Sequence, residues 1–151
     1  MTRNTAICLA TAFCICAASS THAHHSHPIF YDQCRSVTIE GHVETVQWKN
    51  PHTLIDLKAD DGTTYHVEWA PLQRLANNGV EGPAKPALAA GARVAVTGNP
   101  GRDGAQIRAN FPELKNDPRP NTVDPRLIRR VDDSWSWALP PMTNPPDCNR
   151  K

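Results

Sequence analysis

The sequence has no apolar run long enough to cross a bilayer and no excess of charge of one sign. Its longest uncharged apolar stretch, residues 6–18, falls short of the roughly 20 residues that a membrane-spanning helix needs. Lysine and arginine number 16, against 15 aspartate and glutamate residues, and the basic group of Arg126, Arg129 and Arg130 is small. We therefore expect no membrane insertion of the mature chain and no nucleic-acid partner, which would need a concentrated basic surface.

The short motifs that mark common enzyme sites are also missing. The sequence contains no nucleophile elbow, phosphate-binding loop, dinucleotide fingerprint or zinc-protease helix. We identify no catalytic residues and favour a binding role over an enzymatic one.

Residues 1–23 have the organisation of a secretory signal peptide. Arg3 provides a short positive region, residues 6–18 an apolar core, and Thr21 and Ala23 the small residues before a cleavage site. Cleavage after Ala23 predicts a periplasmic or secreted protein whose first residue is His24.

Cysteine is scarce once this leader is removed. Of the five cysteines, only Cys34 and Cys148 lie beyond residue 23. In an oxidising compartment the simplest outcome is one disulfide between them, which would join the start of the domain to the end of the chain. The alternative is a free or intermolecular thiol.

The first predicted strand is long and bent. Residues 36–48 (SVTIEGHVETVQW) are β-branched and roughly alternating, which predicts a strand. The apolar parity changes after Val43, which indicates a one-residue bulge near Glu44 and Thr45. Gly41 marks a bend or a close approach of another backbone.

A hairpin follows, with residues 52–59 and 63–70 on either side of the Asp60-Asp61-Gly62 turn. A two-residue turn would mix apolar and polar side chains on each face. A three-residue loop with Gly62 in the left-handed conformation instead pairs Leu57 with Tyr65 and gives one apolar face, so we favour it. On the other face, this register gathers a polar patch of His52, Asp56, His66 and Glu68.

The remaining elements suggest a small closed barrel. Residues 71–79 read as a short helix, and residues 93–98 and 105–111 as two further strands. An OB-like barrel has this order of three strands, a helix and two strands. We therefore predict an all-β fold with one short helix, in which residues 36–114 form a five-stranded OB-like barrel. A small open β-sandwich is the alternative. Residues 24–35 form a histidine-rich segment, and residues 115–151 a Pro-rich, irregular extension.

Two interpretations of that extension are open. Trp135 and Trp137 either dock against the barrel or form a segment that binds a partner.

Several short motifs carry a resemblance to a known family. They are Ala23-His24-His25-Ser26, Asp32, Gly41-His42-Val43, Val46-Gln47-Trp48-Lys49-Asn50-Pro51-His52, Val67-Glu68-Trp69 and Arg102-Asp103-Gly104. With them the chain resembles a domain-of-unknown-function family of small exported bacterial proteins. The resemblance implies an exported, OB-like domain and brings no established activity. The chain departs from the family pattern in His27-Pro28, in its cysteine pair and in its Pro-rich tail.

The histidines offer a transition-metal site. After cleavage, the α-amine and imidazole of His24 would close a chelate ring, with His25 and His27 as further donors. His52 or His66 would complete a site for copper, or alternatively zinc; His42 is a further candidate. Asp56 and Glu68 would orient a ligating imidazole. The plainer interpretations are a spacer segment, a solvated strand face and, for His52, a hydrogen bond that stabilises the turn.

The competing hypothesis involves no cofactor. In it the chain is an interaction module that binds a protein or small ligand through the barrel face or the Trp135–Trp137 segment. An OB-like fold hosts many functions and does not decide between the two hypotheses.

Overall fold

The computed structural model describes residues 27–103, 120–142 and 145–149. Within them the strands are β1 (Val37–Gln47), β2 (Leu54–Ala59), β3 (Thr64–Glu68), β4 (Arg93–Pro100), β5 (Thr122–Arg130) and β6 (Ser136–Ala138). The helices are α2 (His27–Phe30), α3 (Leu72–Asn77) and α4 (Glu81–Ala87). The predicted signal peptide, His24, His25 and the predicted strand 105–111 lie outside the described residues.

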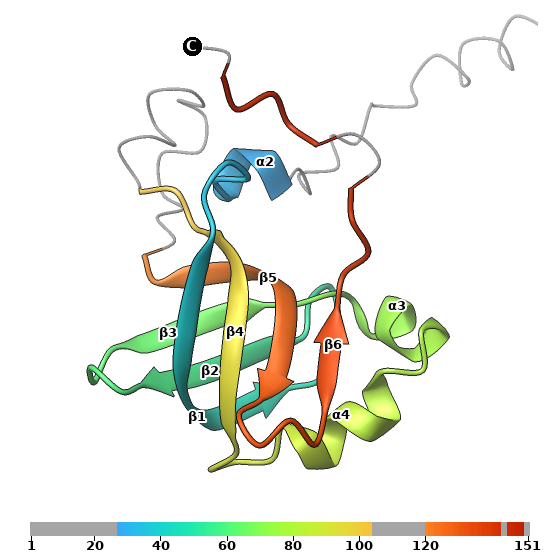
Figure 1. Cartoon of the computed structure of the whole chain (residues 1–151). Coiled ribbons are helices and arrows are strands. Elements are labelled where there is room, and N and C mark those ends of the chain that lie inside the picture. Colours follow the sequence, from blue (N-terminus) through green and yellow to red (C-terminus); the bar gives the residue numbers. More distant parts are fainter. Residues whose placement is uncertain (1–26, 104–119, 143–144, 150–151) are drawn as a thin grey trace, which may run out of the picture.

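Five of these strands close into a barrel, as the sequence predicts. The hydrogen-bonded order is β3-β2-β1-β4-β5-β6, and a parallel pairing of β3 with β5 joins the two ends of the five-stranded part (Figure 1). The closing pairs are His66 with Thr122 and Val67 with Val123. Closure removes the exposed edges that an open sheet of this size would present.

The strand that closes the barrel lies in a segment for which the sequence predicts irregular structure. β5 lies inside the segment from residue 115 that was predicted to be irregular, so that prediction is wrong for residues 122–130. Pro125 and the charged residues of TVDPRLIRR hide the strand pattern. The proline is accommodated because the β4–β5 register shifts between Thr97 and Gly98, which places Gly98 opposite Pro125.

The first strand and the hairpin match their predictions. The β1–β2 register shifts between Val43 and Thr45, which is the expected bulge. Leu57 pairs with Tyr65 and Asp56 with His66, and Gly62 has φ 86°. The three-residue loop is thereby confirmed.

Two helices follow the hairpin, although only the first was predicted. α3 lies between Pro71 and Gly79 as expected, and it buries Leu75. The connector after it also forms a helix, α4, which buries Ala84 and Ala87. The prolines of Glu81-Gly82-Pro83-Ala84-Lys85-Pro86 mask this helix, because proline is rare inside helices except in the first turn.

The tryptophans of the tail pack against the barrel. Trp69 is buried, and its ring centroid lies 5.1 Å from that of Trp137, 6.5 Å from that of Trp135 and 6.3 Å from that of Trp48. β6 pairs with β5 and places Trp137 opposite Ile128. The docked arrangement, the first of the two interpretations, is the one that the structure contains.

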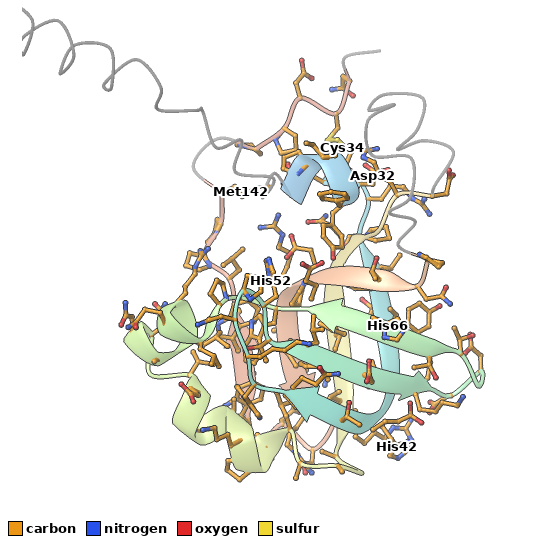
Figure 2. The ribbon with its side chains drawn as sticks, turned by 180° about the vertical axis from the view of Figure 1, so that it is seen from behind. Asp32, Cys34, His42, His52, His66 and Met142 are labelled. Carbon is orange, nitrogen blue, oxygen red and sulfur yellow. A yellow bond between two sulfur atoms is a disulfide. The ribbon has the colours of Figure 1, made fainter. Side chains whose placement is uncertain are left out.

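A disulfide joins Cys34 to Cys148, as predicted from the cysteine count. It lies beside α2 at one end of the barrel and fixes the last described residues there (Figure 2). No helix among the described residues has the length and apolarity needed to cross a membrane.

Candidate functional site

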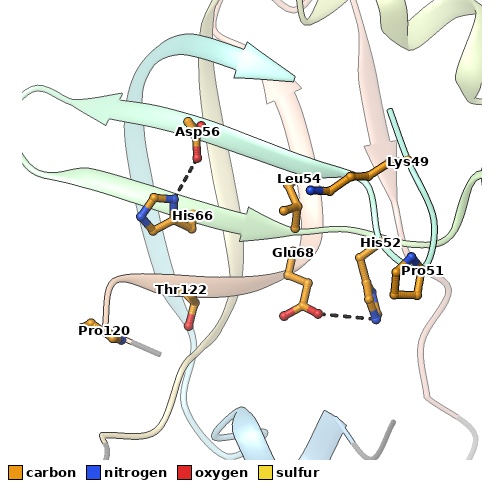
Figure 3. Close-up of a pocket in the computed structure, with 9 residues that line it drawn as sticks. All are labelled: Lys49, Pro51, His52, Leu54, Asp56, His66, Glu68, Pro120 and Thr122. Carbon is orange, nitrogen blue, oxygen red and sulfur yellow. Dashed lines mark hydrogen bonds and ion pairs between the residues drawn. The ribbon is translucent and has the colours of Figure 1, made fainter. Parts of the chain in front are cut away.

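A groove runs across the polar face of the hairpin. Its volume is about 530 Å³, and Figure 3 shows the side chains that surround it. The lining comes from the loop before β2, from β2 and β3, and from the start of β5: Lys49, Pro51, His52, Leu54, Asp56, His66, Glu68, Pro120 and Thr122. The groove therefore depends on the barrel closure that brings β5 next to β3.

The register of the hairpin sets the first polar pair of the groove. Asp56 of β2 faces His66 of β3, and the His66 Nδ1–Asp56 Oδ1 distance is 2.8 Å. Thr45, placed opposite Asp56 by the β1 bulge, donates its hydroxyl to Asp56 Oδ2 at 2.7 Å. Burial raises the pKa of Asp56, but the hydrogen bonds from Thr45 and His66 outweigh this effect and lower that pKa below its ordinary value.

This pair leaves one nitrogen of His66 available. A carboxylate only accepts hydrogen bonds, so Nδ1 carries the proton in the bond to Asp56. The neutral ring then presents the lone pair of Nε2, which has no hydrogen-bond partner in the described part of the chain. The side chain of His66 is 55% exposed, so Nε2 is accessible.

The second pair is more buried and fully engaged. His52 Nε2 lies 3.4 Å from Glu68 Oε1, and the side chains are 17% and 15% exposed. His52 Nδ1 lies 3.1 Å from the carbonyl oxygen of Trp69, so acceptors face both ring nitrogens. Tyr31 donates its hydroxyl to Glu68 Oε2. The hydrogen bond to the Trp69 carbonyl matches the plainer interpretation of His52.

The loop that carries His52 is held from both sides. Asn50 accepts a hydrogen bond from the backbone N–H of Leu72 through its Oδ1 at 3.2 Å, which ties the loop to α3. Lys49 donates to Gln47 Oε1 at 2.7 Å and lies along the groove. The backbone of Thr53 next to His52 pairs with Trp69 and Ala70.

The predicted polar patch is therefore one groove with two separate pairs. His52, Asp56, His66 and Glu68 all line it, but no group of three or more histidine, cysteine, aspartate or glutamate side chains among the described residues is arranged to hold a metal ion. His42 lies elsewhere, exposed on β1 between Lys58 and Arg93 (Figure 2). His27 begins α2, and its side chain is outside the described part.

The sequence analysis missed the two hydroxyl groups that donate to the carboxylates of the groove, those of Thr45 and Tyr31. The position of Thr45 follows from the bulge, because the register shift turns its side chain to the same face as Asp56. The sequence pattern that predicts the bulge could therefore have identified Thr45. Tyr31 carried no such signal. It reaches Glu68 across 37 positions of the chain, a contact that only the folded barrel creates.

Comparison with known proteins yields a family and no activity. Residues 12–109 match the model of a family described as a family of unknown function (DUF6152). No curated protein matches the chain.

Proposed function

The chain belongs to the DUF6152 family, whose function is unknown, and we propose that it is an exported protein that binds a transition metal, with copper favoured over zinc. The metal ligands in this proposal are the amine and imidazole of His24, the imidazole of His25, and His66 of the barrel. Nitrogen donors of this kind suit Cu(II) in a tetragonal arrangement. His27 is a further donor on the same segment.

The observation that carries the proposal is the Thr45–Asp56–His66 chain. A ligating histidine commonly donates its other ring N–H to a carboxylate, which fixes the ring and raises its basicity. His66 has that arrangement and an accessible Nε2. His52 does not, since acceptors face both of its nitrogens. Of the two barrel histidines first considered, His66 is therefore the better ligand.

The position of α2 supports a contribution from the mature amino terminus. Tyr31, directly after α2, reaches Glu68 in the groove, and Glu68 is about 7 Å along β3 from His66 on the same face. α2 is one turn, about 6 Å long. The proposed ligands His24 and His25 precede the first residue of α2 by three and two positions in the sequence.

Copper titration of the exported, processed protein tests the proposal. We expect one Cu(II) per chain, with the affinity reduced about tenfold or more by His66→Ala and about tenfold by Asp56→Asn, which removes the orienting carboxylate. His42→Ala is the matched control, because His42 is an exposed strand histidine outside the groove. Its affinity should equal that of the wild type.

A second control examines the terminus itself. Mass spectrometry of the secreted protein establishes whether it begins at His24, and a variant that retains residues before His24 removes the terminal chelate. Equal, weak binding by the processed and the extended protein would overturn the proposal. A His66→Ala protein that binds copper as tightly as the wild type would also overturn the proposal.

A second candidate function rests on the size of the groove. A volume of about 530 Å³ falls in the range of small-molecule sites, and Pro51, Leu54 and Pro120 give it apolar walls. In this candidate an organic ligand occupies the groove without metal. Screening small ligands by thermal shift with chelator present tests it, and Leu54→Arg, which obstructs the groove, should abolish any shift.

A further inference from the structure

A second pocket, the tail pocket, lies between α3, β5 and the segment that follows β6. Its volume is about 430 Å³, which falls in the range of small-molecule sites. It shares no described lining residue with the groove, so the two are separate. Figure 1 shows the chain leaving β6 on the side where α3 lies. The side chains of the tail pocket that matter for binding are Arg74, Pro125, Arg126, Trp137, Leu139 and Met142.

The walls of the tail pocket are apolar and partly aromatic. Pro125 is buried, and Trp137 is half-buried and packs edge-on to Trp69 with 5.1 Å between the ring centroids. Leu139 and Met142 line the same space. Met142 is 39% exposed, and it is one of only two large apolar side chains that are exposed in the described part of the chain. Because a methionine adapts its shape and makes favourable contacts with aromatic rings, these walls suit a flat apolar ligand.

One guanidinium of the tail pocket is held in a fixed position. Arg126 donates its Nε–H to Asn99 Oδ1 at 2.8 Å, and Asn99, which is buried, donates its amide to the carbonyl oxygen of Arg35 at 2.7 Å. Asp124 Oδ2 lies 3.7 Å from Arg126 Nη2, which is too long for a direct hydrogen bond. The terminal nitrogens of Arg126 therefore make no hydrogen bond among the described residues. They form a positioned fork of the kind that pairs with a planar anion.

A second guanidinium borders the tail pocket without a partner. Arg74 of α3 is exposed, and its side chain forms no hydrogen bond or ion pair within the described part of the chain. Among the described lining residues, two guanidinium groups thus stand against the single carboxylate of Asp124. This balance of charge favours an anionic ligand.

We propose that the tail pocket binds a small aryl carboxylate. The carboxylate pairs with the terminal nitrogens of Arg126 in two parallel hydrogen bonds, and Arg74 adds a second positive charge. The ring lies against Trp137 and Met142. A planar anion with two oxygens matches the guanidinium fork, and the aromatic body matches the walls. The proposal involves no metal and does not depend on the proposed function.

Naphthylacetate is a suitable probe, because it joins a carboxylate to a flat aromatic body. Its neutral amide, naphthylacetamide, has nearly the same shape without the charge, and acetate has the charge without the ring. Isothermal titration of the full protein with each compound measures the affinities. We expect naphthylacetate to bind, and the amide and acetate to bind about tenfold or more weakly.

Substitutions in the tail pocket test the role of each part. Arg126→Lys keeps the charge but loses the fork, so the affinity for naphthylacetate should fall about tenfold. Arg74→Gln should weaken binding less, because this guanidinium is exposed. Met142→Glu places a carboxylate at the exposed rim and should weaken binding more than the neutral Met142→Gln. Arg129→Gln is the matched control, since Arg129 of β5 pairs with Asp133 and lies outside the pocket lining.

Several outcomes would overturn the proposal. They are no binding of naphthylacetate, equal binding of its amide, equal binding of inorganic phosphate, and an affinity that folded Arg126→Lys leaves unchanged. Leu54→Arg obstructs the groove and should leave naphthylacetate binding as in the wild type. If Leu54→Arg abolishes binding instead, the ligand occupies the groove and the proposal is wrong. Circular dichroism establishes folding, and Met142→Glu, at an exposed position, serves as the test if Arg126→Lys does not fold.

Discussion

At the residue scale, Asp56 shows how neighbouring groups shift the pKa of a carboxyl group. Burial raises the pKa of this carboxyl, and the hydrogen bonds from Thr45 and His66 outweigh it, so the folded pKa lies below the ordinary 3.8. A depressed carboxyl pKa contributes stability that is fully present above the unfolded value. That contribution is lost as the pH falls through the folded value, so its loss is confined to pH below about 4.

Removing one hydrogen bond should reverse part of this shift. In His66→Ala we expect the pKa of Asp56 to rise toward its ordinary value, measured by carbon NMR of the carboxyl group from about pH 6 to pH 2. His42→Ala should leave the titration of Asp56 as in the wild type. A wild-type pKa for Asp56 at or above 3.8 would contradict the hydrogen-bond network described for the groove.

Gly41 is a second residue whose identity the packing dictates. A Cβ at this position would lie 2.2 Å from the carbonyl oxygen of Lys58 and 2.8 Å from the Cα of Ala59, both backbone atoms. Gly41→Ala forces β1 and β2 apart, and we expect the free energy of unfolding in urea to fall by about 2 kcal/mol or more. Gly82→Ala in α4 meets nothing within 4 Å and should cause no loss, with a gain of up to about 1 kcal/mol.

At the scale of elements, β6 is held against the barrel by its side chains more than by its few backbone hydrogen bonds. It has three residues and pairs only with β5 among the described strands. Trp137 nevertheless packs edge-on to the buried ring of Trp69, 5.1 Å between centroids. Edge-to-face aromatic pairs add about 0.5–1.5 kcal/mol beyond the area that they bury. The tail thereby adds aromatic contacts to the outside of the closed five-stranded barrel.

Trp137→Ala should therefore destabilise the whole domain. We expect the free energy of unfolding to fall by about 2–3 kcal/mol, less than for a fully buried tryptophan because Trp137 is half-buried. Urea denaturation followed by circular dichroism measures this. Val131→Ala, at an exposed position in the β5–β6 turn, should change stability by no more than about 0.5 kcal/mol. A Trp137→Ala protein as stable as the wild type would show that the tail docks without stabilising the barrel.

At the scale of the whole molecule, two connections close the structure. The parallel pairing of β3 with β5 closes the sheet, and the Cys34–Cys148 disulfide links positions 114 apart in sequence. A crosslink over so long a loop restricts the unfolded chain, and the chain-entropy model gives about 4–5 kcal/mol as an upper value. The β3–β5 pairing involves neither cysteine.

We expect the double variant Cys34→Ser, Cys148→Ser to fold into the same barrel with a stability lower by about 2–4 kcal/mol. Urea unfolding of the oxidised wild type and the variant measures the difference, and the reduced wild type should resemble the variant. Loss of the native circular dichroism spectrum in the variant would show that the barrel depends on the crosslink to form.

Local patterns predicted the hairpin and much of the groove. The alternation in β2 and β3 and the Gly62 turn were enough to place Asp56 beside His66. The same patterns failed for α4 and β5, where Pro86 and Pro125 occupy positions that local rules disfavour. In both cases tertiary packing overrides propensity, because Ala84 and Val123 are buried in the shared core.

The sequence by itself determined the hairpin register, the β1 bulge, the pairing of the two cysteines beyond residue 23 and the face that carries the groove, since each follows from a local period or from the count of available partners. Only the tertiary structure decided which strand closes the barrel, that Tyr31 meets Glu68, and that acceptors engage His52 on both nitrogens while His66 keeps one accessible. These are contacts between segments far apart in the chain. No local pattern specifies them, because they arise only when closure brings the segments together.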